Sequence, residues 1–246
     1  EIYTLSLHDA LPIFGAGSYE SYFNDHSNVS YLYQARKQVT NVGWAYIEGI
    51  GTGADDINGL ERRNRYLKMK GKPLLERTYY TDSIMGFAYG SGPTGITSRV
   101  RQSFEKIQTM VSDDLGDRIP TILVLNVFGF SRGAAAARHF VHTVKTQPRS
   151  FIGWNLTRER IIVNFVGLFD TVSSYSAVGS VSPERTRAFD DDVKDLHLNF
   201  ERGYASKVFH LTAADEYRLY FSLTNINSAI RHGAPKIGRA SCRERV

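Results

Sequence analysis

The order of apolar and polar residues along the chain predicts strands and helices in alternation. Short apolar runs rich in β-branched residues are typical of strands buried in a parallel sheet, and apolar residues three or four positions apart are typical of helices. Because the two kinds of segment alternate, we expect a mainly parallel, doubly wound α/β sheet. The predicted strands are residues 42–50, 122–128, 160–169 and 205–213, and the predicted helices are residues 28–38, 96–115 and 190–199.

One predicted strand, residues 122–128, runs directly into a glycine-flanked serine and then into four alanines. The sequence GFSRG at residues 129–133, between a strand and an alanine-rich helix, matches the nucleophile elbow G-x-S-x-G of α/β-hydrolases. A turn this tight holds Ser131 in a strained conformation, with its Oγ exposed at the carboxyl end of the strand. The alternative is an ordinary turn between a strand and a helix that happens to contain a serine.

The residues around the serine have predicted roles in this elbow. Gly129 and Gly133 let the helix approach the strand, because a Cβ atom at either position would collide with the neighbouring element. The backbone N–H of Arg132 points toward the oxyanion that forms at a substrate carbonyl, supported by the positive end of the helix. Ser131 is then the predicted nucleophile.

A serine nucleophile needs a base, and the base needs an acid that orients it. Asp170 follows the strand predicted at residues 160–169. Active sites of open α/β sheets lie at the carboxyl ends of strands, so Asp170 is the predicted acid. The alternative is an aspartate that caps a helix or forms a turn.

The sequence leaves the identity of the base open. His210 follows Asp170 in the order usual for α/β-hydrolases, but it falls inside the strand predicted at residues 205–213, where a histidine more often packs in the core. Since a strand rises about 3.3 Å per residue, we expect the His210 ring to lie roughly 10 Å or more below Ser131 Oγ. The other candidates are His26, which precedes the serine, His139 and His142 on the helix after it, His197 on the helix predicted at 190–199, and His232, which the pattern does not place.

Composition limits the classes of protein to consider. The chain has 246 residues, of which 42% are apolar and 22% charged, which is ordinary for a globular domain. It has no apolar run of transmembrane length, and a single cysteine, Cys242, excludes a disulfide framework or a cysteine-based metal site. The net charge of +5 is spread along the chain, so it permits contact with anionic lipid or phosphate without arguing for it.

Both ends of the chain resemble translated sequencing adapters. The two segments are EIYTLSLHDALPI at residues 1–13 and IGRASCRERV at residues 237–246. When back-translated, each is similar to a sequencing adapter. The codons possible at Phe14 and Lys236 agree with the two joins. We therefore expect residues 14–236 to be the natural part, a metagenomic fragment truncated at both ends, and we exclude the two adapter-like segments from the prediction of the fold.

Several segments together resemble one family of proteins. They are SNVSYLY at residues 27–33, YIEGIGTG at 46–53, GSGPTGI at 90–96, GFSRGAAAARHF at 129–140, VGLFDTV at 166–172 and AADEYR at 213–218. As a set they are similar to the catalytic domain of bacterial type VI secretion phospholipase effectors, formerly a large α/β-hydrolase domain of unknown function. The resemblance covers most of residues 18–229.

The resemblance implies an α/β-hydrolase fold and a phospholipase that acts through an acyl-serine intermediate, with Ser131 as nucleophile and Asp170 as acid. Such chemistry needs no metal or organic cofactor. The resemblance also implies a bacterial protein that is made in the cytoplasm and delivered to a target cell. Its implied partners are a phospholipid or other ester substrate, a secretion-apparatus carrier and an immunity protein, with no nucleic acid.

Two motifs of the family do not occur within residues 14–236. Members usually open with a strand ending in Asp-Gly-Thr near the oxyanion hole, and they carry the catalytic histidine in a Gly-x-His motif on a later strand. These motifs would precede Phe14 and follow Lys236, so we expect the base to lie beyond Lys236 and the fragment alone to be inactive. The alternatives are a carboxylesterase acting on soluble esters and a catalytically silent hydrolase-like module of a larger protein.

Overall fold

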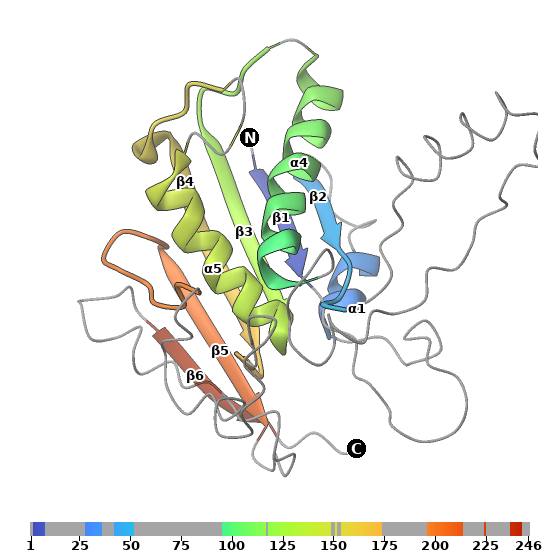
Figure 1. The fold of residues 1–246 in the computed structure, drawn as a ribbon, viewed down its shortest axis with the longest axis vertical. Helices are drawn as coiled ribbons and strands as arrows, with labels where there is room; N and C mark the ends of the chain where they lie inside the picture. Colours follow the sequence, from blue (N-terminus) through green and yellow to red (C-terminus); the bar gives the residue numbers. More distant parts are fainter. Residues whose placement is uncertain are drawn as a thin grey trace, which may run out of the picture.

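The computed structural model describes residues 2–7, 28–35, 42–51, 95–116, 118–148, 151, 154–173, 196–213, 224 and 237–242. These residues form one parallel sheet with helices packed against it (Figure 1). The strands are β1 (Ile2–Leu7), β2 (Val42–Ile47), β3 (Leu123–Phe130), β4 (Ile161–Phe169), β5 (Lys207–Ala213) and β6 (Ile237–Cys242). The helices are α1 (Asn28–Ala35), α4 (Ile96–Leu115), α5 (Arg132–Thr146) and the short 3₁₀ helix η4 (Arg158–Arg160).

Because the described strands are parallel, their carboxyl ends all lie along the same side of the sheet. The strand order is β2-β1-β3-β4-β5-β6, and each neighbouring pair is parallel. The chain passes from β1 to β2 and then returns to the other side of β1 to form β3. Ligand sites in open α/β sheets lie at the carboxyl ends of the strands beside such a reversal. The end of β3 is therefore the expected place for a site.

Helices cover both faces of the sheet. Helices α4 and α5 lie in front of the strands in Figure 1 and pack against each other. Side chains alternate along β2, so that the buried Ala45 and Ile47 belong to the core beneath α4 and α5. Tyr46 takes the opposite face, where its ring packs 4.9 Å from that of Tyr33 in α1. The doubly wound arrangement predicted from the sequence is thus present in the described residues.

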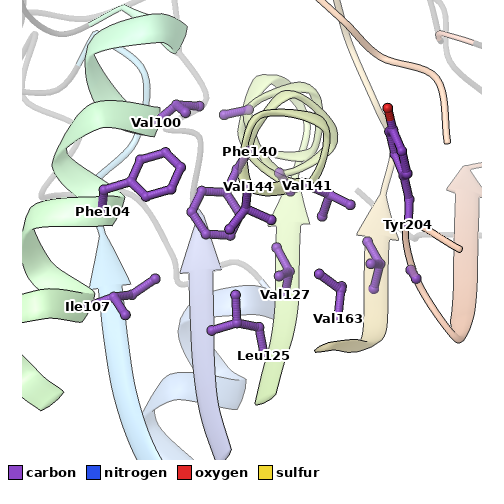
Figure 2. Close-up of a cluster of buried hydrophobic side chains, with 14 of the residues drawn as sticks. Val100, Phe104, Ile107, Leu125, Val127, Phe140, Val141, Val144, Val163 and Tyr204 are labelled. Atoms are coloured by element: carbon purple, nitrogen blue, oxygen red, sulfur yellow. The ribbon is translucent and has the colours of Figure 1, made fainter. Parts of the chain in front are cut away.

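The hydrophobic core fills the space between the sheet and helices α4 and α5. Figure 2 shows Phe104 and Ile107 of α4 and Phe140 of α5 packed over Leu125 and Val127 of β3. The ring centroids of Phe104 and Phe140 are 5.0 Å apart. The apolar residues recur every three or four positions on the helices and every second position on β3. Full burial of each of these side chains stabilises the fold by about 1.5–3 kcal/mol.

A β-bulge in β4 keeps its apolar residues facing the core. Leu125 of β3 pairs with Val163, but the next residue, Asn126, pairs with Phe165, so Asn164 is an extra residue in β4. The Asn164 side-chain amide donates a hydrogen bond to Asn126 Oδ1 at 3.1 Å. Because side chains alternate along a strand, removing this residue would move the core-facing side chains in the second half of β4 to the opposite face of the sheet.

The sequence pattern predicted one helix wrongly. The described part of the helix predicted at 190–199, residues 196–199, has no regular secondary structure. Leu196, Leu198 and Phe200 are buried, and this two-residue spacing belongs to an extended chain rather than a helix. The Leu198 carbonyl accepts a hydrogen bond from buried Arg138 Nε of α5 at 2.5 Å. Tertiary contacts with α5 therefore override the local helical preference.

The two adapter-like segments take part in the sheet, although the prediction of the fold left them out. Residues 2–7 form β1 between β2 and β3, and residues 237–242 form β6 beside β5. Strand β6 lies at an open edge of the sheet, where unpaired N–H and C=O groups accept an added strand of almost any sequence. Strand β1 lies inside the sheet and is paired on both sides. Backbone pairing does not identify the origin of a segment, so the origin of both stays a prediction.

We predict that Gly129→Ala destabilises the fold. A Cβ atom at Gly129 would lie 2.5 Å from the Gly133 carbonyl oxygen and 2.6 Å from Ala134 Cα. Both are backbone atoms that cannot move without shifting α5, so we expect a loss of about 1–3 kcal/mol in the free energy of unfolding, measured by chemical denaturation. Gly203→Ala is the comparison, because a φ of 84° strains an alanine backbone there while open space surrounds its Cβ position, so it measures backbone strain without a steric contact. A Gly129→Ala variant as stable as the wild type would contradict this contact.

Candidate functional site

Ser131 lies at the tip of β3, immediately before α5, in a backbone conformation that serine rarely adopts. Its φ is 54° and its ψ is −123°. Within the described residues, Ser131 and Asp170 are the two non-glycine residues with positive φ. Such a conformation costs about 1–3 kcal/mol and persists only where surrounding contacts enforce it. The strain predicted for the elbow is therefore present.

The side chain of Ser131 does not act as a helix cap. A serine that caps a helix has extended dihedral angles and a side-chain oxygen bonded to an N–H of the first turn, but Ser131 has neither. Its carbonyl oxygen accepts the N–H groups of Ala134 and Ala135, at 3.0 and 3.3 Å. Its Oγ is buried and has no hydrogen-bond partner within the described part of the chain. The side chain of Ser131 thus forms no hydrogen bond with a described residue that would explain the strain.

One expectation about Ser131 is wrong. The elbow motif predicts an exposed Oγ, but Ser131 is only 1% exposed. The residues that follow β4 pack over the end of β3, since Val172 N donates to the Ser131 carbonyl oxygen at 3.2 Å and Val172 and Thr171 are themselves buried. A position at the tip of a strand therefore does not by itself expose Oγ.

Arg132 is the first residue of α5. The first four N–H groups of an α-helix have no acceptor within the helix and point out of its positive end. The Arg132 N–H is one of these groups, and it directly follows Ser131, as the predicted oxyanion role requires. The Arg132 residue is fully buried.

Asp170 lies level with Ser131 on the neighbouring strand. Phe130 of β3 pairs with Phe169 of β4, so the two following residues stand side by side at the carboxyl edge, about one strand spacing, or 4.8 Å, apart. Ser131 N donates to the Phe169 carbonyl oxygen at 2.8 Å, which ties the two tips together. Asp170 has a φ of 46°, so the second predicted site residue also has a left-handed backbone conformation.

His210 lies deeper in the sheet than Ser131 and Asp170. It pairs with Leu168 of β4, two residues before Asp170, and it is 2% exposed. Its Nε2 accepts a hydrogen bond from the backbone N–H of Thr171 at 3.2 Å. The structure therefore brings His210 to the turn that carries Asp170, and the Ser131 hydroxyl is not its hydrogen-bond partner.

Three other histidines gather on a different part of α5. His197 stacks on His142 with ring centroids 4.1 Å apart, and on His139 at 6.1 Å. The backbone N–H of His197 donates to His139 Nδ1 at 3.2 Å. These rings are engaged with one another and with the segment that precedes β5. The two remaining candidates, His26 and His232, lie outside the described residues.

Sequence reasoning missed the polar residues that hold the turn after β4. Thr224 N donates to the Thr171 carbonyl oxygen at 2.7 Å, and Thr224 Oγ1 donates to Ser173 Oγ at 2.7 Å. All three residues are buried. No spacing or motif links residues so far apart along the chain, so only the folded structure reveals the contact.

Two further findings concern metal ions and membranes. They hold no group of three or more histidine, cysteine or acidic side chains arranged to bind a metal ion. None of the described helices is long and apolar enough to span a bilayer.

The comparisons with known proteins give structural similarity alone. No family model matches the chain, and no curated protein matches it. One similar solved structure is the Tle1 effector bound to the VgrG spike from the Type 6 secretion system, with 20% identity and a TM-score of 0.47 over 98% of this chain and 49% of that chain. Another is an uncharacterized protein from Pseudomonas aeruginosa, with 19% identity and a TM-score of 0.44 over 98% of this chain and 40% of that chain. The chain spans half or less of the length of each.

We predict that the stacked histidines make the fold less stable in mild acid. Burial, together with the neighbouring His197 and His142, lowers the pKa of His139 from 6.5 to about 4. Between these two values the unfolded chain binds more protons than the folded chain, so stability is lost as the pH falls from about 6.5 toward 4. We expect a drop of about 1–2 kcal/mol in the free energy of unfolding between pH 7 and pH 5, measured with urea.

His139→Asn is the matched control for this pH dependence. The asparagine side chain would keep an acceptor near the Nδ1 position for the His197 N–H but would not titrate. The variant should show a visibly flatter dependence of stability on pH. His142, whose pKa burial also lowers, would leave a smaller dependence of the same sign. An unchanged slope in the His139→Asn variant would show that His139 is not the titrating group.

Proposed function

We propose that the chain is the catalytic part of a serine esterase of the α/β-hydrolase type, with phospholipid as its substrate. The observation that carries the proposal is the conformation of Ser131, which is strained at the end of β3 while its hydroxyl neither caps α5 nor bonds to a described neighbour. Strained residues of this kind cluster at active sites. The strand, turn and helix around Ser131 agree with the nucleophile elbow.

In this proposal the residues have the following roles in acyl transfer. The base takes the proton of Ser131 Oγ as the oxygen attacks the ester carbonyl carbon, and the N–H of Arg132 stabilises the oxyanion. The base then gives the proton to the departing alcohol, which leaves an acyl group on Ser131. Water hydrolyses this acyl-serine by the same two steps and releases the carboxylic acid. Asp170 orients the base.

The base itself is not assigned to a described histidine. His210 Nε2 accepts the Thr171 N–H, and His139 Nδ1 accepts that of His197. The resemblance in motifs supports a base from a Gly-x-His motif beyond Lys236, and the proposal keeps it there. A secretion-apparatus carrier, such as the VgrG spike on which the Tle1 effector was solved, and an immunity protein are the partners that the proposal implies.

A catalytically silent hydrolase-like module is the second candidate function. It is favoured by one observation, the absence of a hydrogen bond between Ser131 Oγ and an imidazole among the described residues. The two candidates differ in a simple measurement, because a silent module has no esterase activity in the protein expressed from its natural reading frame. A soluble-ester carboxylesterase would instead hydrolyse short-chain esters and leave phospholipid vesicles intact.

We predict that Ser131→Ala abolishes ester hydrolysis by the protein expressed from its natural reading frame. Loss of the nucleophile of a triad costs about a million-fold in kcat. The assay measures release of fatty acid from phospholipid vesicles and of alcohol from a short-chain ester. Ser103→Ala is the matched control, because Ser103 is a buried serine on α4 whose Oγ bonds to the Arg99 carbonyl oxygen, away from the site. A Ser131→Ala variant with even a tenth of the wild-type rate would rule out Ser131 as nucleophile.

We predict that Asp170→Asn lowers kcat by about ten-thousand-fold without unfolding the protein. An amide at this position would hold the base in the wrong tautomer, so it could not accept the serine proton. Asp113→Asn on the exposed surface of α4 is the control for loss of a negative charge. If the Asp170→Asn variant kept both its fold and its rate, another residue would have to be the acid.

A further inference from the structure

The turn that carries Asp170 is held by hydrogen bonds from both neighbouring strands. On the side of β3, the Phe169 carbonyl oxygen accepts Ser131 N at 2.8 Å, and Val172 N donates to the Ser131 carbonyl oxygen at 3.2 Å. On the side of β5, Asp170 N donates to the Leu211 carbonyl oxygen at 2.9 Å. The backbone of Asp170 is therefore fixed relative to Ser131 by bonds that flank it on each side.

Two further hydrogen bonds, both to backbone atoms of Thr171, fix the turn. Its N–H donates to His210 Nε2 at 3.2 Å, and its carbonyl oxygen accepts Thr224 N at 2.7 Å. Thr171, Thr224 and His210 are all buried, so water does not compete for these bonds. The acceptor of the Thr171 N–H is an imidazole nitrogen, whereas the acceptors of the other hydrogen bonds that hold this turn are backbone carbonyl oxygens.

We propose that His210 is a positioning residue for the Asp170 turn and not the base of the reaction, an inference that rests on the proposed role of Asp170. A backbone N–H can only donate, so His210 Nε2 must present its lone pair and the imidazole proton must sit on Nδ1. That single lone pair is engaged by Thr171 and does not accept the proton of Ser131.

The position of His210 in the sheet supports the same assignment. Its partner in β4 is Leu168, two residues below the level of Asp170 and Ser131, which is about 7 Å along the strand direction. Strand β5 is also separated from β3 by β4, so His210 lies about two strand spacings, or roughly 9.6 Å, across the sheet from Ser131. A base must come within about 3 Å of the serine oxygen. These offsets separate backbone positions, and the His210 ring bonds to the turn after β4 while Ser131 Oγ has no hydrogen bond to an imidazole of the described residues.

Two substitutions at His210 separate a positioning role from a catalytic one. Gln Oε1 is the same number of bonds from Cα as His Nε2, so His210→Gln keeps an acceptor for the Thr171 N–H but has no group that acts as a base. His210→Leu keeps the bulk and removes the acceptor, which leaves a buried N–H without a partner. A base would be lost equally in both variants, whereas a positioning residue is replaced by Gln.

The first measurement is hydrogen exchange at the Thr171 amide in the full chain, read by NMR or by mass spectrometry of peptides that span residues 168–173. We expect exchange to be about ten-fold faster in His210→Leu and within about three-fold of the wild type in His210→Gln. His139→Leu is the matched control, because the His139 ring also accepts a backbone N–H, that of His197. It should speed exchange at His197 and leave Thr171 unchanged. Equal exchange at Thr171 in all variants would overturn the proposal.

The second measurement is ester hydrolysis by the same variants in the protein expressed from its natural reading frame. We expect His210→Gln to keep most of the wild-type kcat and His210→Leu to lose at least ten-fold of it, with KM little changed. If His210→Gln instead lost activity about a million-fold, as for a triad member, His210 would be the base and the proposal would be wrong. Should His210→Leu fail to fold, the exchange and kcat of His210→Gln decide the question.

The two measurements also separate this inference from the proposed function. A wild-type protein without esterase activity, but with the expected exchange pattern, would contradict the esterase and support the hold of His210 on the turn. An active esterase whose Thr171 amide exchanges fast even in the wild type would support the esterase and contradict the hold.

Discussion

The close contact between the end of β3 and the first turn of α5 is the constraint on which the candidate site depends. Helix α5 begins directly after Ser131, and its first turn lies so near Gly129 that a Cβ atom there would meet the helix backbone at 2.5 Å. With the strand and the helix packed this tightly, one residue must reverse the chain between them. That residue is Ser131, and its positive φ of 54° is the consequence. The packing of α5 on the sheet thus enforces a strain that serine would not otherwise accept.

The same constraint extends to the neighbouring strand. Because β3 and β4 are paired up to their last residues, the ends of the two strands meet, and hydrogen bonds link Ser131 to Phe169 and Val172. Asp170 lies between these two contacts and also takes a left-handed conformation. The bulge at Asn164 sets the register in which this meeting occurs. Ser131 and Asp170, which carry a hydroxyl and a carboxyl group, thereby lie side by side where the order of the strands reverses. Open α/β sheets bind ligands at this place.

Much of this arrangement could be predicted from local sequence. The glycines around Ser131 and the alanines of α5 predicted the turn, and the apolar spacing of α4 predicted both of its ends. The place of Asp170 at a strand end followed from the apolar run before it. Local sequence failed where distant residues decide the outcome. The chain at residues 196–199 is extended because it packs along α5. Ser131 is buried at a strand tip, where its carbonyl oxygen accepts the N–H of Val172 from the turn after β4.

The bonds that hold the site were also beyond sequence reasoning. The acceptor of the Thr171 N–H is a histidine on the next strand, and the donor to its carbonyl oxygen is Thr224. Neither hydrogen bond produces a periodic pattern in the sequence, because each depends on how the ends of the strands meet in the folded structure. His210 illustrates the limit most clearly, because its place inside a strand indicated a core histidine but did not reveal that its ring accepts the Thr171 N–H.

If the elbow makes Ser131 a reactive nucleophile, a reagent that forms a covalent bond with activated serines should label it. A fluorophosphonate forms a bond from phosphorus to the oxygen of an activated serine, with loss of fluoride and of the serine proton. The protein expressed from its natural reading frame would be treated with this probe, digested and examined by peptide mass spectrometry. We expect a single phosphonate adduct, on Ser131. An adduct on another serine, such as Ser173, or no adduct on the folded protein would contradict it.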